Sequence, residues 1–193
     1  MRHSRALRLG TILALGVTAA ALLAATAGAG QVFRDTVHEE GVDVVPNFCD
    51  VPGMTVAVAF TLDLRVQVVP HGRDRLDYFL QHGRRSEVLT NLANGKKVTT
   101  LSIVTEKDKT VTDNGDGTLT IVILATGNAV LYGPDGKAIA RNPGQLRFAI
   151  LVDHAGTPTD PFDDEFLAEL GVVKESTGRS DDFCAAAVPA LGG

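Results

Sequence analysis

The sequence predicts a mainly β domain: an antiparallel meander that closes into a small up-and-down β-barrel or curls into a sandwich, with one short C-terminal helix. Three observations predict this class. Every even-numbered residue from Met54 to Val68 is apolar, which is the alternation of a β-strand. The segments that follow alternate in a similar way and are joined by short turns rich in Gly, Asn and Asp. Only after Asp153 does the apolar period become helical.

The first long strand is predicted over Met54–Pro70, after a short lead-in with edge structure around Phe33–Val37. At roughly 3.3 Å per residue it would run about 50 Å, far beyond the usual strand of about 5–6 residues. Such a strand must bend or take part in two layers. Its odd-numbered side is polar or small and includes Asp63 and Arg65. Pro70 is expected to end the strand, because proline has no N–H for a ladder.

The next segments predict further strands. The segment 76–92 is expected to pair antiparallel with the first long strand and to bend at Gly83. Asn94-Gly95 is a strong signal for a tight hairpin, because both residues tolerate positive φ. The remaining strands are expected over Lys97–Glu106, Thr118–Thr126, Ala129–Tyr132, Lys137–Arg141 and Gln145–Asp153, with turns at Asp113–Gly117, Gly133–Gly136 and Asn142–Gly144.

Two helical segments are predicted at the C-terminal end. Thr159 or Asp160 can cap a helix, Pro161 suits its first turn, and the acids that follow suit the positive end of the helix dipole. Phe162, Phe166, Leu167 and Leu170 recur at helical spacing, and Gly171 supplies a stop. One more helical turn is expected over Asp182–Ala187.

Residues 1–29 have the layout of a secretory signal peptide: three arginines, an apolar core and two small-residue cleavage sites. A retained membrane anchor is the alternative, but the apolar run is short for a span of about 20 residues. We therefore expect a secreted, extracellular single β-rich domain over residues 30–193, with no stable membrane span after cleavage. The leader holds three of the 18 Lys and Arg and none of the 23 Asp and Glu, so the net charge changes from −5 to −8. Such an acidic domain is a poor candidate for binding nucleic acid or anionic lipid.

The chain has two cysteines, Cys49 and Cys184, near opposite ends of the secreted domain. In an oxidising compartment such a pair predicts one disulfide. Two free thiols or a redox site are the alternative, which the absence of a C-x-x-C motif disfavours.

Several runs resemble a group of secreted actinobacterial proteins of unknown function. They are V-T-D-N-G-D-G-T-L-T-I (111–121), Y-G-P-D-G-K (132–137), N-P-G-Q-L-R-F (142–148), L-V-D-H-A-G-T-P-T-D-P (151–161) and D-F-C (182–184). The resemblance spans about residues 33–187. It implies a secreted one-domain protein and no particular activity.

No catalytic constellation stands out. The four histidines of the secreted domain lack metal-binding spacing, the acids Asp160–Glu165 suit helix capping better than calcium, and no G-x-S-x-G motif is present. We therefore expect neither a cofactor nor a metal. The absence of Trp disfavours sugar-binding modules and lipocalins.

Three hypotheses remain. The first is a non-catalytic β-barrel that binds a small hydrophobic ligand or presents a surface. The second is an enzyme on a barrel shaped like allene oxide cyclase or dirigent proteins, with Asp63, Arg65 and Glu87 in the lumen. The third is a cell-envelope interaction protein that uses an open sheet edge.

Overall fold

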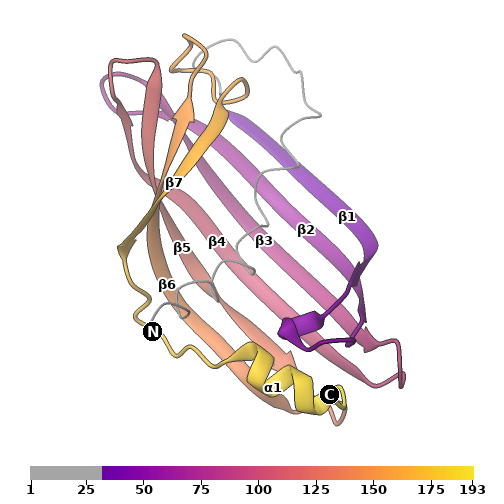
Figure 1. The fold of residues 1–193 in the computed structure, drawn as a ribbon. Helices are drawn as coiled ribbons and strands as arrows, with labels where there is room; N and C mark the ends of the chain where they lie inside the picture. Colours follow the sequence, from indigo (N-terminus) through magenta and orange to yellow (C-terminus); the bar gives the residue numbers. More distant parts are fainter. Residues whose placement is uncertain (1–31) are drawn as a thin grey trace.

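The computed structural model describes residues 32–193, so the predicted signal peptide over residues 1–29 lies outside the described residues. Seven strands form one antiparallel sheet in which each strand pairs with its neighbours in the chain (Figure 1). They are β1 (Phe33–Val45), β2 (Val56–His71), β3 (Leu76–Asn91), β4 (Lys97–Asp113), β5 (Thr118–Tyr132), β6 (Ala138–Asp153) and β7 (Glu165–Lys174). A 3-10 turn, η2 (Phe48–Asp50), precedes β2, and the helix α1 (Phe183–Ala190) follows β7. The predicted mainly β meander with a short C-terminal helix is confirmed.

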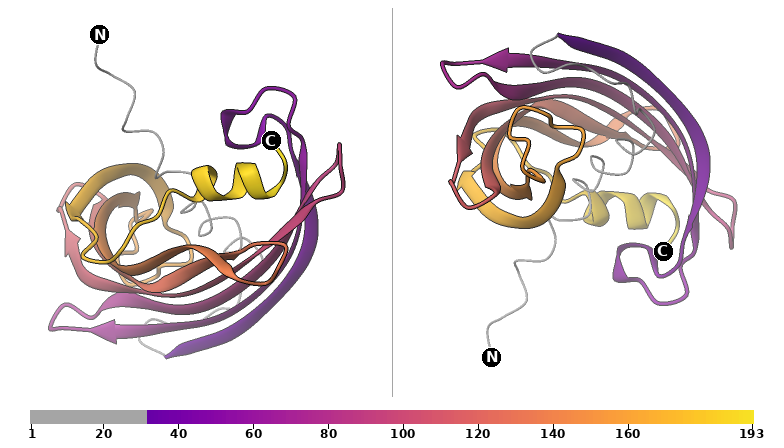
Figure 2. Two further views of the ribbon diagram at one scale, coloured as in Figure 1. Left: turned by 90° about the horizontal axis from the view of Figure 1, so that it is seen from below. Right: turned by 90° about the horizontal axis from the view of Figure 1, so that it is seen from above.

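The sheet curls but does not close. β1 and β7 are its two edges, and they are not paired with each other. Figure 2 shows the sheet curved around α1, so we call the face that carries α1 the concave face and the opposite face the convex face. The end of the sheet beside α1 is the helix end, and the end beside the β6–β7 loop is the loop end. Of the two predicted forms, a closed barrel and a curled sheet, the structure therefore has the curled sheet, which stays open between β1 and β7.

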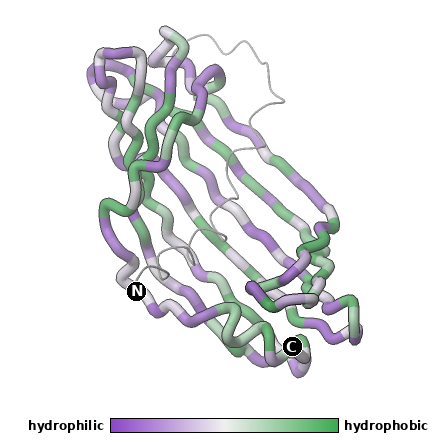
Figure 3. The backbone as a smooth tube through the Cα atoms, viewed as in Figure 1, coloured by the Kyte–Doolittle hydropathy of each residue, from purple (hydrophilic) through white to green (hydrophobic). Residues whose placement is uncertain are grey.

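The long alternating strand is β2, as predicted, and its even-numbered residues lie on the concave face. Val56, Leu62 and Val68 are buried there, whereas Asp63 and Arg65 on the convex face are exposed. Figure 3 shows the same alternation of hydrophobic and hydrophilic residues along several strands. β2 ends at His71, one residue after Pro70, where the hairpin that leads into β3 begins.

The helix predicted from Asp160 to Leu170 is wrong. Residues 165–174 form the edge strand β7, which pairs with β6. Asp160 does accept a hydrogen bond from the backbone N–H of Phe162 (3.2 Å), but it caps a turn. Gly171, expected as a helix stop, has φ +98° and lies beside an irregularity of the β6–β7 ladder. Pairing with β6 supplies this segment with long-range backbone hydrogen bonds, and these outweigh the local helical spacing.

The predicted turn at Asn142–Gly144 is also wrong, because β6 runs straight through it. Pro143 is tolerated because the outer edge of β6 is covered here by the segment after β7, and Asp181 exchanges two hydrogen bonds with the backbone of Arg141. Gly144 belongs to a row of glycines across the sheet: Gly83 on β3, Gly127 on β5 and Gly144 on β6 lie at one level, with Val104 of β4 between the first two. We call this set the glycine row.

The glycine row lies on the concave face, where a side chain would meet the curled sheet. A Cβ atom added to Gly127 would lie 2.4 Å from the carbonyl oxygen of Ile103. A Cβ atom added to Gly83 would meet only the end of the Leu64 side chain, at 2.9 Å. Glycine is therefore needed at residue 127 for the strands to approach each other. Gly83, where a bend or bulge was expected, belongs to the glycine row, and the register of β3 with β2 and β4 shows no bulge there.

Two hydrophobic cores lie on either side of the glycine row. The core at the helix end joins η2 and α1 to strands β2–β6, through Phe48, Met54, Val56, Val58, Leu89, Val98, Leu131, Ala140, Ala187 and Leu191. Leu191 is fully buried, and its carbonyl accepts hydrogen bonds from the amides of Asn91 (3.0 Å) and Asn94 (2.9 Å). Asn94 belongs to the predicted Asn94-Gly95 turn and Asn91 ends β3 just before it, so the β3–β4 hairpin holds the end of α1 in place.

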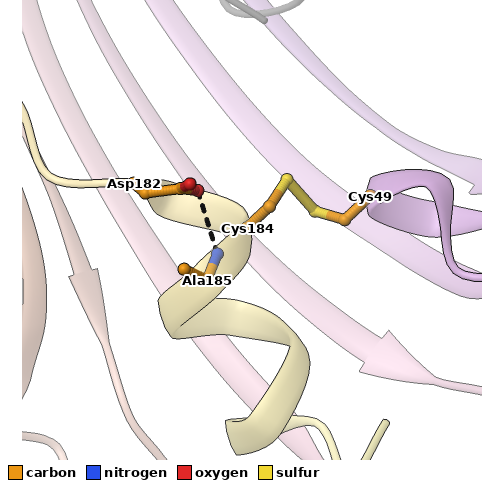
Figure 4. The surroundings of a disulfide bond; sticks show 4 residues. All are labelled: Cys49, Asp182, Cys184 and Ala185. Atoms are coloured by element: carbon orange, nitrogen blue, oxygen red, sulfur yellow. Dashed lines mark hydrogen bonds between the residues drawn. A yellow bond between two sulfur atoms is a disulfide. The ribbon is translucent and has the colours of Figure 1, made fainter.

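The predicted disulfide between Cys49 and Cys184 is present (Figure 4). Its Cα atoms are 5.6 Å apart, and it joins η2 to the first turn of α1. Asp182 caps that turn by accepting a hydrogen bond from the N–H of Ala185 (3.0 Å). The crosslink is compatible with an oxidising compartment.

The loop end has its own small core of Val111, Leu119 and Val152, with Leu76, Tyr78, Ile121 and Ile150 packed against it. The β6–β7 loop returns across this end to the opposite edge of the sheet. Its Phe162 ring contacts Phe33 at the start of β1, with ring centroids 4.9 Å apart, and Phe79 of β3, at 6.4 Å. Side chains thus connect the two edges where no backbone ladder does.

Candidate functional site

The edge strand β7 exposes more large apolar side chains than a solvated edge normally does. Phe166, Leu167, Leu170, Val172 and Val173 are each 46–58% exposed. Consecutive residues of a strand point to opposite faces, so neither face of β7 is covered by the rest of the domain. Exposed apolar edge strands are typical sites of protein association. The spacing of Phe166, Leu167 and Leu170 predicted one side of a helix, and Val172 and Val173 lay beyond its expected stop, so the sequence did not predict this edge.

The ladder between β6 and β7 is interrupted three times. Leu167, Leu170 and Val173 are left out of the register with β6, and all three are exposed. Bulges of this kind disturb a regular backbone ladder on the outer edge and re-aim side chains. β7 therefore offers a partner mainly its apolar side chains, and less a regular row of unpaired backbone N–H and C=O groups.

The three charged residues that the sequence singled out do not come together. Asp63 and Arg65 lie exposed on the convex face of β2, while Glu87 lies on the concave face of β3. Nδ1 of His38 lies 2.7 Å from Oδ1 of Asp63, and this hydrogen bond raises the pKa of His38. No luminal set of Asp63, Arg65 and Glu87 exists for barrel catalysis.

Glu87 belongs to a small polar cluster on the concave face. Nε of Arg85 donates to one oxygen of Glu87 (2.6 Å), and the Thr100 hydroxyl donates to the other (2.7 Å). The Arg85 guanidinium lies over the Phe60 ring, 4.4 Å from its centroid. Both charges are about four-fifths buried and are paired with each other, so the cluster is satisfied internally and has a structural role.

Two carboxyl groups at the loop end are strongly perturbed. Burial, helped by the charges of Asp164 and Glu106, raises the pKa of Asp108 to about 7, although the N–H of Phe79 donates to it (2.7 Å). Burial also raises the pKa of Asp164 to about 7, helped by the charge of Asp163. The alternation at the end of β4 places Asp108 on the concave side, but the sequence did not mark it as buried.

Within residues 32–193, no group of three His, Cys, Asp or Glu side chains is arranged to hold a metal ion. The same part of the chain contains no helix with the length and apolar character needed to cross a bilayer. Two depressions on the convex face are both open to solvent. One is lined in part by Arg34, Arg65 and His82, and the other by Val42, Val88 and Tyr132. Neither is an enclosed apolar cavity of the kind that a carrier of hydrophobic ligands uses.

Comparison with protein-family models, with curated proteins and with solved structures finds no match to this chain. The function must therefore be argued from the surfaces of the molecule.

Proposed function

We propose that this chain is a secreted, non-catalytic interaction domain of the cell envelope, and that its recognition element is the open β7 edge. The observation that carries this proposal is the exposure of five large apolar side chains on a ten-residue edge strand. Secretion is supported by the leader predicted over residues 1–29 and by a disulfide compatible with an oxidising compartment. A leader cleaved near residue 29 can be checked by the intact mass of the exported protein.

The partner that β7 fits best is a second copy of β7. The strand reads E-F-L-A-E-L-G-V-V-K from Glu165 to Lys174, with an acid at its start, a base at its end and apolar residues between. Two such strands lying antiparallel, and in contact through their side chains, would be complementary about a twofold axis between Glu169 and Leu170. The axis would pair Glu165 with Lys174, Phe166 with Val173, and Leu167 with Val172 of the second copy.

The other edge, β1, lacks this complementarity. It also exposes apolar residues, Val42 and Val44, but the same strand carries Glu39, Glu40 and Asp43. An antiparallel pair of β1 strands about their midpoint would place the two Glu39 carboxylates opposite each other, which is destabilising. Charge therefore favours β7 over β1 for association between identical chains.

Sedimentation velocity over a concentration series tests the proposal. The unmodified chain should form a dimer, and Leu170→Lys should make it monomeric, whereas Val42→Lys on the β1 edge should not. Both side chains are more than half exposed, so neither change should affect folding. A chain that stays monomeric throughout, or a dimer that Val42→Lys disrupts and Leu170→Lys does not, would contradict the proposal.

A charge exchange tests the register itself. Glu165→Lys should weaken the dimer by bringing two lysines together, and so should Lys174→Glu by bringing two acids together. The double variant should recover most of the lost affinity, because each opposite pair is restored. A double variant as weak as the sum of the two single changes would exclude this register.

A further inference from the structure

The two faces of the sheet carry opposite charge. In β1–β4 up to Asp108, where the ladder has no bulge, alternation assigns every side chain to one face. The concave face has seven carboxyl groups and one cation, a formal net charge of −6 with every carboxyl group ionised: Asp35, Glu39, Asp43, Asp77, Glu87, Glu106 and Asp108 against Arg85. The convex face has five cations and two carboxylates, a net charge of +3: Arg34, Arg65, Arg84, Lys97 and Lys107 against Glu40 and Asp63.

The convex charge is concentrated around Arg65. In the register, Arg65 stands directly between Thr36 of β1 and His82 of β3, and Arg34 lies diagonally beside it, opposite Gln67. Neighbouring cations on one face repel each other unless an anion lies between them. No ion pair of Arg34 or Arg65 is found in the described part of the chain.

The acids near these arginines are already engaged. Asp63, two residues before Arg65 on the same face, is bonded to His38 at 2.7 Å. Asp35 borders the same region, but it belongs to the concave side of β1 and accepts a hydrogen bond from the N–H of Thr36 (2.7 Å). Within the described residues neither carboxylate forms an ion pair with Arg34 or Arg65, so the hydrogen-bond donors of both exposed guanidinium groups are available to a ligand.

The cations border a depression of about 570 Å³ that reaches from β1 to β4. Its polar lining consists of Arg34, Thr36, Arg65, Gln67, His82 and Thr105, together with Asp35 at the rim. Nδ1 of His82 is within 2.9 Å of the Thr105 hydroxyl, which fixes the imidazole ring in position. At a strand spacing of about 4.8 Å, the depression crosses roughly 14 Å of sheet, which is wide enough for more than a bare anion.

We propose that this depression is a binding site for an organic phosphate ester, held by the guanidinium groups of Arg34 and Arg65. A guanidinium donates two parallel hydrogen bonds to one pair of oxygens, so one arginine satisfies a carboxylate. Two adjacent arginines match a phosphate group, which offers three oxygens or more. The hydroxyl group of Thr36 and the amide of Gln67 supply further donors for the polar part of the ester. The site is independent of the β7 edge.

Isothermal titration calorimetry with glycerol 1-phosphate tests this assignment, with inorganic phosphate and succinate as comparison ligands. The ester should bind, and succinate should bind at least tenfold more weakly. Arg65→Gln and Arg34→Gln should each weaken ester binding by tenfold or more. Arg84→Gln removes a cation from the same face outside the depression and should change the affinity less than twofold. All three arginines belong to exposed surface, so the variants can be checked for unchanged thermal unfolding.

Three results would overturn the assignment. Equal affinity for succinate and the ester would indicate a general anion patch. If Arg84→Gln lowered the affinity for the ester as much as Arg65→Gln does, only the net charge of the convex face would matter. Co-sedimentation with vesicles of phosphatidylglycerol, but not phosphatidylcholine, in the absence of ester binding would assign the phosphate recognition to a lipid surface. The site in the depression predicts no such vesicle binding, since the whole secreted domain is acidic.

Discussion

Replacing Asp108 by Asn should change the pH dependence of folding in a defined direction. Burial raises the pKa of Asp108 from 3.8 to about 7 in the folded protein. The folded state therefore binds this proton more tightly than the unfolded state does. Stability falls as the pH rises from about 4 to about 7, and the loss is complete above that range. At about 1.36 kcal/mol per pKa unit, the buried carboxylate costs at most about 4 kcal/mol.

The amide introduced by Asp108→Asn keeps an oxygen that can accept the N–H of Phe79, but it does not ionise. Urea unfolding at pH 5 and at pH 8 measures the consequence. Relative to the unmodified chain, Asp108→Asn should gain about 1–3 kcal/mol more at pH 8 than at pH 5. Comparing one variant at two pH values cancels any change in packing. Asp43→Asn removes an exposed carboxylate from β1 and is the matched control.

Two outcomes would refute the reasoning. If Asp108→Asn changes stability equally at both pH values, the carboxyl group is not desolvated in the folded state. If the Asp43→Asn control shows the same pH dependence, the effect comes from the net charge of the domain. Asp164 has a similarly raised pKa but is less deeply buried, so Asp164→Asn should show a smaller difference of the same sign.

Four further variants test how the sheet is held together. Gly127→Ala should lower the free energy of unfolding in urea by about 1–3 kcal/mol, because the added Cβ would meet the backbone of β4. Gly83→Ala should lower it by less than about 1 kcal/mol, because the added Cβ would meet only the end of the Leu64 side chain, which can move. The double change Cys49→Ser and Cys184→Ser should lower the free energy of unfolding by up to about 5 kcal/mol, measured by denaturation without reductant. Phe162→Ala should cost about 1–3 kcal/mol and speed hydrogen exchange in residues 154–164.

Local signals predicted the strands of the meander well. The even-numbered apolar residues of β2 mark the buried face, and Asn94-Gly95 marks the β3–β4 hairpin. Both depend on residues that are close in sequence. The Cys49–Cys184 pair could be predicted across 135 residues only because no other cysteine competes.

The errors lie where distant pairing decides the structure. The segment from Phe162 to Leu170 has helical spacing, but β6 needs a neighbour, and Val172 and Val173 favour a strand. Asn142-Pro143-Gly144 has the composition of a turn, but it lies within β6 because the segment at Asp181 covers its outer edge. The apolar β7 edge could not be predicted while these residues were assigned to a helix.

The candidate binding residues show the same limit. Alternation correctly placed Asp63 and Arg65 on one side of β2, but it does not tell which side faces α1. The cluster of Arg34, Arg65 and His82 comes from three strands and depends on their register. No spacing within one strand predicts it.

We expect the glycine row to separate the molecule into two cooperative units. The core at the helix end and the core at the loop end lie on opposite sides of it and share no residue. The disulfide and the Asn91 and Asn94 contacts tie down only the first core. Side chains that would transmit packing between the cores are missing at three positions along one level of the sheet. The loop end, with β7, should therefore open at a lower free energy than the helix end, so that the β7 edge can rearrange while the rest stays folded.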